Sequence, residues 1–130
     1  NDRRGLAALS ISDPSHISCV ANDYGYEYVF SHQLRSLGTK GDLLLVFSGS
    51  GNSPNIVQAI NEAKTLGITS YAMLGFDGGQ CLQLADKTIH FKANDMQISE
   101  DFQMIVGHIV AKHLTKIISE IKIKRINTTM

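Results

Sequence analysis

Apolar residues follow two patterns along this chain, short continuous runs and longer segments with helical spacing. The runs, which predict β-strands, are Leu6–Ile11, Asp42–Phe47, Thr69–Leu74 and Lys87–Phe91. The run Asp42–Phe47 (DLLLVF) is the clearest, because it is apolar at almost every position and lies between Gly41 and Ser48. Such a run is typical of a strand that a parallel sheet buries on both faces.

The segments with helical spacing alternate with these strands. They are a short turn at His16–Ala21, then Tyr26–Leu37, Pro54–Leu66 and Ser99–Ile121. Ser53 and Pro54 suit the N-cap and the first position of the third segment, and Gly67 ends it. Alternation of this kind implies crossovers between parallel strands. We therefore predict one α/β domain over residues 1–130, a three-layer sandwich with helices flanking a mostly parallel sheet.

Composition narrows the class of protein. Twelve basic residues balance twelve acidic ones, so the sequence lacks the basic excess expected of a nucleic-acid-binding protein. No apolar run approaches the roughly 20 residues needed to span a membrane, and we expect no membrane partner. Cys19 and Cys81 have apolar neighbours, which suggests reduced core thiols and a cytoplasmic protein.

The segment Ser48–Ser53 (SGSGNS) combines hydroxyls and glycines between a predicted strand and a predicted helix. Glycines let the backbone approach a ligand closely, and a helix N-terminus favours an anion. We therefore predict that Ser48, Ser50 and Ser53 bind a phosphate monoester. The loop has no lysine, which excludes a P-loop, and Pro54 replaces the third glycine of a dinucleotide fingerprint. The alternative is a turn that only caps the helix.

Three stretches resemble the SIS (sugar isomerase) domain family, and within it the phosphoheptose isomerases. They are SHISCVANDYGYEYVFSHQL, GDLLLVFSGSGNSPNIVQAI and GFDGG, in a match that runs from about Leu6 to Gln103. The resemblance implies conversion of D-sedoheptulose 7-phosphate to D-glycero-D-manno-heptose 7-phosphate through an enediol. It also implies a homotetramer, or a homodimer, with sites between subunits.

The resemblance further implies roles for individual residues. Asn22 and Asp23 match an Asn-Asp pair whose acid binds sugar hydroxyls, and Gln103 matches a glutamine near the reacting end of the sugar. That glutamine ligates the metal in family members that bind zinc. The remaining predicted substrate contacts are Gly49, Asn52 and Glu100.

Two departures affect the catalytic residues. The family has a histidine eight residues after the glutamine, a position that Ala111 occupies here, so the resemblance leaves zinc possible, with Gln103 as a ligand, but without that histidine. His108 is the nearest candidate for an acid or base, five positions after Gln103. The resemblance also implies an additional N-terminal segment with a general-base glutamate, and this sequence does not contain it.

Two functions therefore compete. The first is a phosphoheptose isomerase, and the second is a non-catalytic phosphosugar-binding or regulatory SIS module, such as a replication-initiator-associating protein. Ala111 favours the second function. A third version is a diverged isomerase in which His108 acts as acid or base. Turnover of a sugar phosphate separates the catalytic functions from the module.

Overall fold

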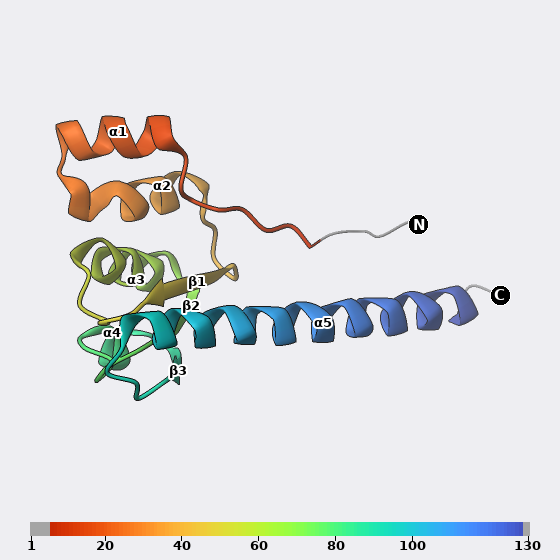
Figure 1. Cartoon of the computed structure of the whole chain (residues 1–130). Helices are drawn as coiled ribbons and strands as arrows, with labels where there is room; N and C mark the ends of the chain where they lie inside the picture. Colours follow the sequence, from red (N-terminus) through yellow and green to blue (C-terminus); the bar gives the residue numbers. More distant parts are fainter. Residues whose placement is uncertain (1–5, 129–130) are drawn as a thin grey trace.

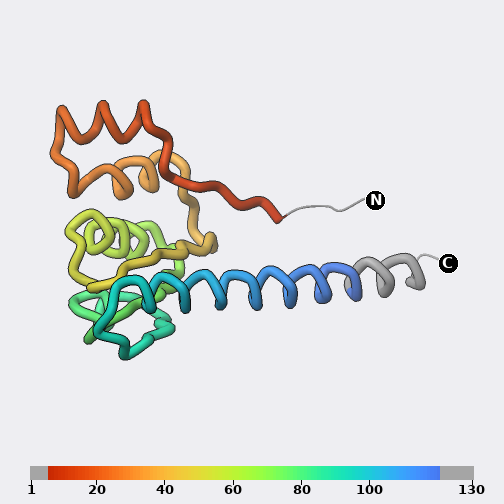
Figure 2. Tube along the Cα trace, in the orientation of Figure 1, coloured from red at the N-terminus to blue at the C-terminus, as the bar shows by residue number. Residues whose placement is uncertain are grey.

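The computed structural model describes residues 6–128, and it describes side chains for residues 6–120. The helices are α1 (Pro14–Asp23), the 3-10 helix η1 (Tyr26–Tyr28), α2 (Val29–Leu37), α3 (Pro54–Leu66), α4 (Cys81–Leu84) and α5 (Met96–Thr128). The strands are β1 (Leu43–Ser48), β2 (Thr69–Leu74) and β3 (Lys87–His90). Figure 1 shows α1, α2 and α3 stacked above β1, while α5 runs far beyond the rest of the fold. The trace in Figure 2 shows the same extension.

The three strands form one parallel sheet in the order β1-β2-β3. Leu44 pairs with Ser70, and Ala72 pairs with Thr88. The sheet and its flanking helices confirm the predicted α/β class. Because all three strands run in the same direction, their carboxyl ends lie at one edge, where open sheets of this type bind ligands.

One face of the sheet forms the core of the domain. Leu44 and Val46 of β1 join Ile60 and Ala63 of α3 in a cluster of buried apolar residues. The two α3 residues are almost fully buried, at 1% and 0% exposure. The predicted bounds of α3 and β2 are confirmed, because spacing, capping and turn residues all favour the same ends.

The other face of the sheet is largely exposed. Leu43, Leu45 and Phe47 of β1 are 62%, 46% and 48% exposed, and Tyr71 of β2 is 38% exposed. The expectation that this strand is buried on both faces is therefore wrong for the described residues. Its residues are buried alternately, because α3 covers one face and no described element covers these side chains on the other.

Two predictions near the start of the chain are wrong. Leu6–Ile11 is not a strand, and Leu6 and Leu9 are 58% and 70% exposed, since no described strand pairs with this segment. The predicted turn at His16 lies within the longer helix α1. Asp13 caps that helix by accepting a hydrogen bond from the His16 backbone N–H at 2.9 Å.

The prediction for the cysteines is half right. Cys81 is fully buried, and this burial raises the pKa of its thiol, so it is an inert core residue. Cys19 is exposed instead, with its Sγ 3.7 Å from an Asp23 carboxylate oxygen. Position 19 faces outward on α1, whereas Val20 faces the interior.

Helix α5 begins earlier than predicted. Its first residue is Met96, because Asp95 accepts a hydrogen bond from the Ile98 backbone N–H at 2.9 Å and so caps the helix. Ser99, the first residue of the predicted segment, is instead buried within the first turn. Within the part of the chain that the structure describes, no helix combines the length and apolarity needed to cross a membrane.

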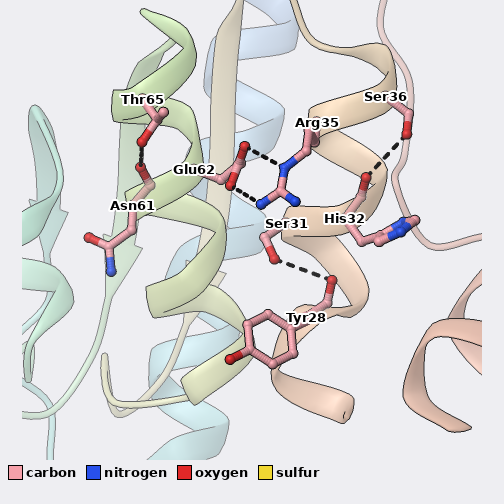
Figure 3. Close-up of polar contacts among 8 residues, drawn as sticks. All are labelled: Tyr28, Ser31, His32, Arg35, Ser36, Asn61, Glu62 and Thr65. Atoms are coloured by element: carbon pink, nitrogen blue, oxygen red, sulfur yellow. Dashed lines mark hydrogen bonds and ion pairs between the residues drawn. The ribbon is translucent and has the colours of Figure 1, made fainter. Parts of the chain in front are cut away.

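An ion pair joins α2 to α3 at the surface. The Arg35 guanidinium donates to both carboxylate oxygens of Glu62, at 2.9 and 2.7 Å (Figure 3). The hydrogen bond from Arg35 lowers the pKa of the Glu62 carboxyl, and Glu62 in turn raises the pKa of Arg35. The arginine side chain is 64% exposed, so solvent screens the pair and its contribution to stability is small.

A second polar cluster connects β2 to the segment before β3. One Asp86 carboxylate oxygen accepts hydrogen bonds from the backbone N–H and the hydroxyl of Ser70, both at 2.8 Å. The Asp86 backbone N–H donates to the Ser70 hydroxyl at 3.1 Å. These hydrogen bonds, that from the Ser70 backbone first, hold the pKa of Asp86 below its usual value.

Asp86→Asn should lower stability at neutral pH and reduce the destabilisation caused by acid. A carboxyl with a depressed pKa in the folded state stabilises the fold above its unfolded pKa, which is about 4. That stability is lost as the pH falls through the folded pKa. Urea unfolding at several pH values measures both effects. Asp101→Asn, at an exposed α5 carboxyl, is the matched control; an unaltered acid dependence in Asp86→Asn would contradict this role.

Candidate functional site

Two loops meet at the carboxyl edge of the sheet. The phosphate loop, which we define as Ser48–Ser53, follows β1, and the second loop, Gly75–Gln80, follows β2. Backbone hydrogen bonds join the loops, from the Gly75 N–H to the Gly49 carbonyl at 2.8 Å and from the Cys81 N–H to the Gly51 carbonyl at 3.0 Å. The phosphate loop is therefore held by its neighbour as well as by its own turns.

Glycine is required at the point where the two loops touch. Gly51 has a φ of +66°, and a Cβ there would collide with the Gly78 carbonyl oxygen. A Cβ at Gly49 would collide with the Met96 sulfur at the start of α5. The predicted close backbone approach at these glycines exists, and the atoms approached are those of the second loop and α5.

The serine hydroxyls of the phosphate loop accept hydrogen bonds from the loop backbone. Ser48 Oγ accepts from the Gly51 N–H at 3.1 Å, and Ser50 Oγ accepts from the Asn52 N–H at 3.2 Å. A hydroxyl that accepts in this way retains its own hydrogen for donation. Both hydroxyls can therefore act as neutral donors to an anion.

Ser53 lies at the N-cap of α3, as predicted, but its side chain does not cap the helix. Its carbonyl accepts hydrogen bonds from the Ile56 and Val57 N–H groups, both at 3.0 Å, so the first turn is closed by the backbone. The Ser53 hydroxyl thus remains available at the positive end of a 13-residue helix. Together with buried Ser48 and half-buried Ser50, it gives this loop three hydroxyls and no cationic side chain.

The side chain of Asn52 is exposed but forms two hydrogen bonds with the protein. Its Oδ1 accepts a hydrogen bond from the Gln80 N–H at 3.0 Å, and its Nδ2 donates to the Ser50 carbonyl at 3.2 Å. This bridge between the loops was missed from the sequence, where Asn52 was a predicted substrate contact. The Gly-Gly pair at 78–79 signals a tight turn there but not the residue it approaches.

The predicted sugar-binding pair lies at the end of α1. Asn22 Nδ2 donates to an Asp23 carboxylate oxygen at 2.7 Å, and both residues are exposed. Figure 1 shows α1 ending on the side toward which β1 points, the side of the phosphate loop. Among the hydrogen bonds of residues 6–120, none joins this pair to the loop.

The predicted site residues on helix α5 differ in their exposure to solvent. Gln103 is buried, and its Nε2 donates to the Met73 carbonyl at 3.3 Å. Glu100, His108 and Ala111 are exposed. Within the described residues, no group of three or more histidine, cysteine or acidic side chains could hold a metal ion. Gln103, the predicted zinc ligand, has no such group beside it in this part of the chain, and no chemical step is assigned to zinc.

The chain matches known proteins over most of its length. The family model described as "SIS domain" matches residues 3–75. The chain is 56% identical over 89 residues to a phosphoheptose isomerase of Cytophaga hutchinsonii, covering 68% of this chain and 47% of that protein. It is 43% identical over 124 residues to one from Glaesserella parasuis, covering 95% and 62% respectively.

Solved structures give the same result. A phosphoheptose isomerase from Francisella tularensis has a TM-score of 0.83 at 28% identity, over 85% of this chain and 60% of that one. For the enzyme from Neisseria gonorrhoeae the TM-score is 0.78 at 31% identity, over 80% and 60%. The chain thus spans between about half and three fifths of the length of these relatives. The family match, the parallel sheet and the serine-rich loop at its carboxyl edge agree: this chain belongs to the SIS domain family.

Proposed function

We propose that the phosphate loop binds the phosphate of a sugar phosphate. The arrangement of three serine hydroxyls at the N-terminus of α3 is the observation that carries this proposal. Two of the hydroxyls are oriented by backbone N–H groups, and the third is not used for capping. A phosphate monoester offers enough acceptor oxygens for several such donors at once.

The substrate we propose is D-sedoheptulose 7-phosphate, and the reaction is aldose–ketose isomerisation to D-glycero-D-manno-heptose 7-phosphate. The names of the similar proteins, all phosphoheptose isomerases, support this choice. In this reaction a base removes the proton from the carbon beside the carbonyl, and an acid serves the oxygens of the enediol. Asn22 and Asp23 would bind sugar hydroxyls, with Gly49 and Glu100 as further contacts.

A second function, a phosphosugar-binding module without turnover, is favoured by one observation. Ala111 has no group that could transfer a proton, and it occupies the position where the resemblance places a histidine. His108 is exposed on the same helix and is the residue that we propose as a candidate acid or base. The module would bind the same ligand through the same loop.

The proposal includes a cytoplasmic homotetramer or homodimer. Helix α5 supports association, because Met104, Ile105, Ile109 and Val110 are 63%, 51%, 61% and 42% exposed. Residues this apolar at neighbouring positions on a helix indicate burial against a partner. The exposed face of the sheet described above supports the same conclusion.

The double variant Ser50→Ala, Ser53→Ala should weaken sugar-phosphate binding by about 1–3 kcal/mol, since it removes two hydroxyl donors from the anion. Calorimetric titration of the protein that contains this chain measures the change. Ser36→Ala, at an exposed serine of α2 that donates to the His32 carbonyl (Figure 3), is a matched control. Equal affinity in the wild type and the double variant would refute phosphate binding by these serines.

The isomerase should exchange the carbon-bound proton next to the sugar carbonyl. Incubation of D-sedoheptulose 7-phosphate with the protein in heavy water, followed by NMR, should show deuterium entering that position. Binding without exchange would identify the module instead. If exchange occurs, His108→Asn tests the acid–base role of this residue, and a fully active variant would exclude it.

The double variant Ile105→Asp, Ile109→Asp should dissociate the oligomer, because it introduces charges into the apolar surface of α5. Sedimentation velocity should give a dimer or tetramer for the wild type and a smaller species for the variant. Lys112→Asp, at an exposed polar position of the same helix, should leave the mass unchanged. A monomeric wild type would contradict the proposed association.

A further inference from the structure

The second loop and Cys81, the first residue of α4, reach the phosphate loop through three hydrogen bonds, of which only one uses a side chain. Two are backbone contacts, at Gly49 and Gly51. The third is the hydrogen bond from the Gln80 N–H to Asn52 Oδ1 at 3.0 Å. Asn52 is therefore the one position among these contacts at which a substitution removes a link between the loops without altering the backbone.

The other end of the Asn52 amide acts on Ser50. Asn52 Nδ2 donates to the Ser50 carbonyl at 3.2 Å, while the Asn52 backbone N–H donates to the Ser50 hydroxyl, also at 3.2 Å. Residue 52 thus fixes both the peptide and the side chain of a predicted phosphate ligand. Because each polar atom of its amide has a partner in the protein, the amide is oriented by the two loops, although Asn52 is exposed.

The packing around this bridge is tight. A Cβ added at Gly79 would lie 2.5 Å from Asn52 Nδ2 and 2.5 Å from the Ser50 carbonyl oxygen. Gly79 has a φ of +50° as well, so the turn presents its backbone directly to the amide of Asn52. The second loop therefore packs its backbone closely against the bridging amide.

We propose that Asn52 is a positioning residue that connects the phosphate loop to the second loop and holds Ser50 ready for the anion, rather than a sugar-binding residue. This inference rests on the proposed binding of phosphate by the loop. It assigns Asn52 a contribution to the affinity for the phosphate group itself, independent of the sugar. A residue that contacted sugar hydroxyls would contribute only when the sugar is present.

The test compares two ligands, inorganic phosphate and D-sedoheptulose 7-phosphate, by calorimetric titration of the wild type and Asn52→Ala. The variant loses two hydrogen bonds that preorganise the loop. Its affinity for both ligands should therefore fall by a similar factor, about tenfold. Hydrogen exchange at the Gln80 N–H should also become faster, because this group loses its acceptor. Asn61→Ala, at an exposed asparagine of α3 (Figure 3), is the matched control and should change none of these values.

Weaker binding of the sugar phosphate with unchanged binding of inorganic phosphate would overturn the inference, because it identifies Asn52 as a sugar contact. Unchanged affinity for both ligands would overturn it as well, while leaving phosphate binding by the serines intact. A wild type that binds neither ligand would refute the proposed function and this inference with it. If Asn52→Ala does not fold, Asn52→Gln provides the same comparison, since its additional methylene moves the amide away from the Gln80 N–H and the Ser50 carbonyl.

Discussion

The parallel pairing of β1 with β2 is the interaction on which the candidate site depends. It brings Ser48 level with Leu74, so that the two following loops leave the sheet side by side. The Gly75 N–H can then reach the Gly49 carbonyl, and the remaining contacts between the loops follow from that first approach. A shift of one residue in this register would reverse the faces of the strand and separate the loops. The hydrophobic contact between β1 and α3 fixes the register, since only one alternation buries Leu44 and Val46.

In the proposed function, the phosphate loop binds its anion through neutral donors. Its hydroxyls are oriented by the loop's own N–H groups, and the helix dipole supplies the favourable potential that a lysine supplies in a P-loop. Such a site is specific through the direction of its donors, because neutral groups attract an anion only at short range. The geometry of the turns is consequently more important here than it would be around a cationic side chain.

Much of this arrangement could be predicted from the sequence. Local signals in the sequence, namely residue spacing, capping residues and turn residues, determine these features. They are the bounds of α3 and β2, the parallel sheet and the serine-rich loop. The wrong predictions share a different cause. Whether Leu6–Ile11 pairs as a strand, and whether β1 is covered on both faces, depends on which other elements are present beside them. The bridge made by Asn52 was missed for a similar reason, because its partner is 28 residues away in the chain.

The contact between Gly51 and Gly78 also constrains how such a domain can change during evolution. Two backbones that touch without side chains leave no room for gradual substitution, because even the smallest added group meets a carbonyl oxygen. Exposed residues at the end of α1 and along α5 are not restricted in this way, because no backbone of another loop in the described part of the chain lies against them. The domain thus combines a region that tolerates few substitutions, where the two loops touch, with helical positions that tolerate more.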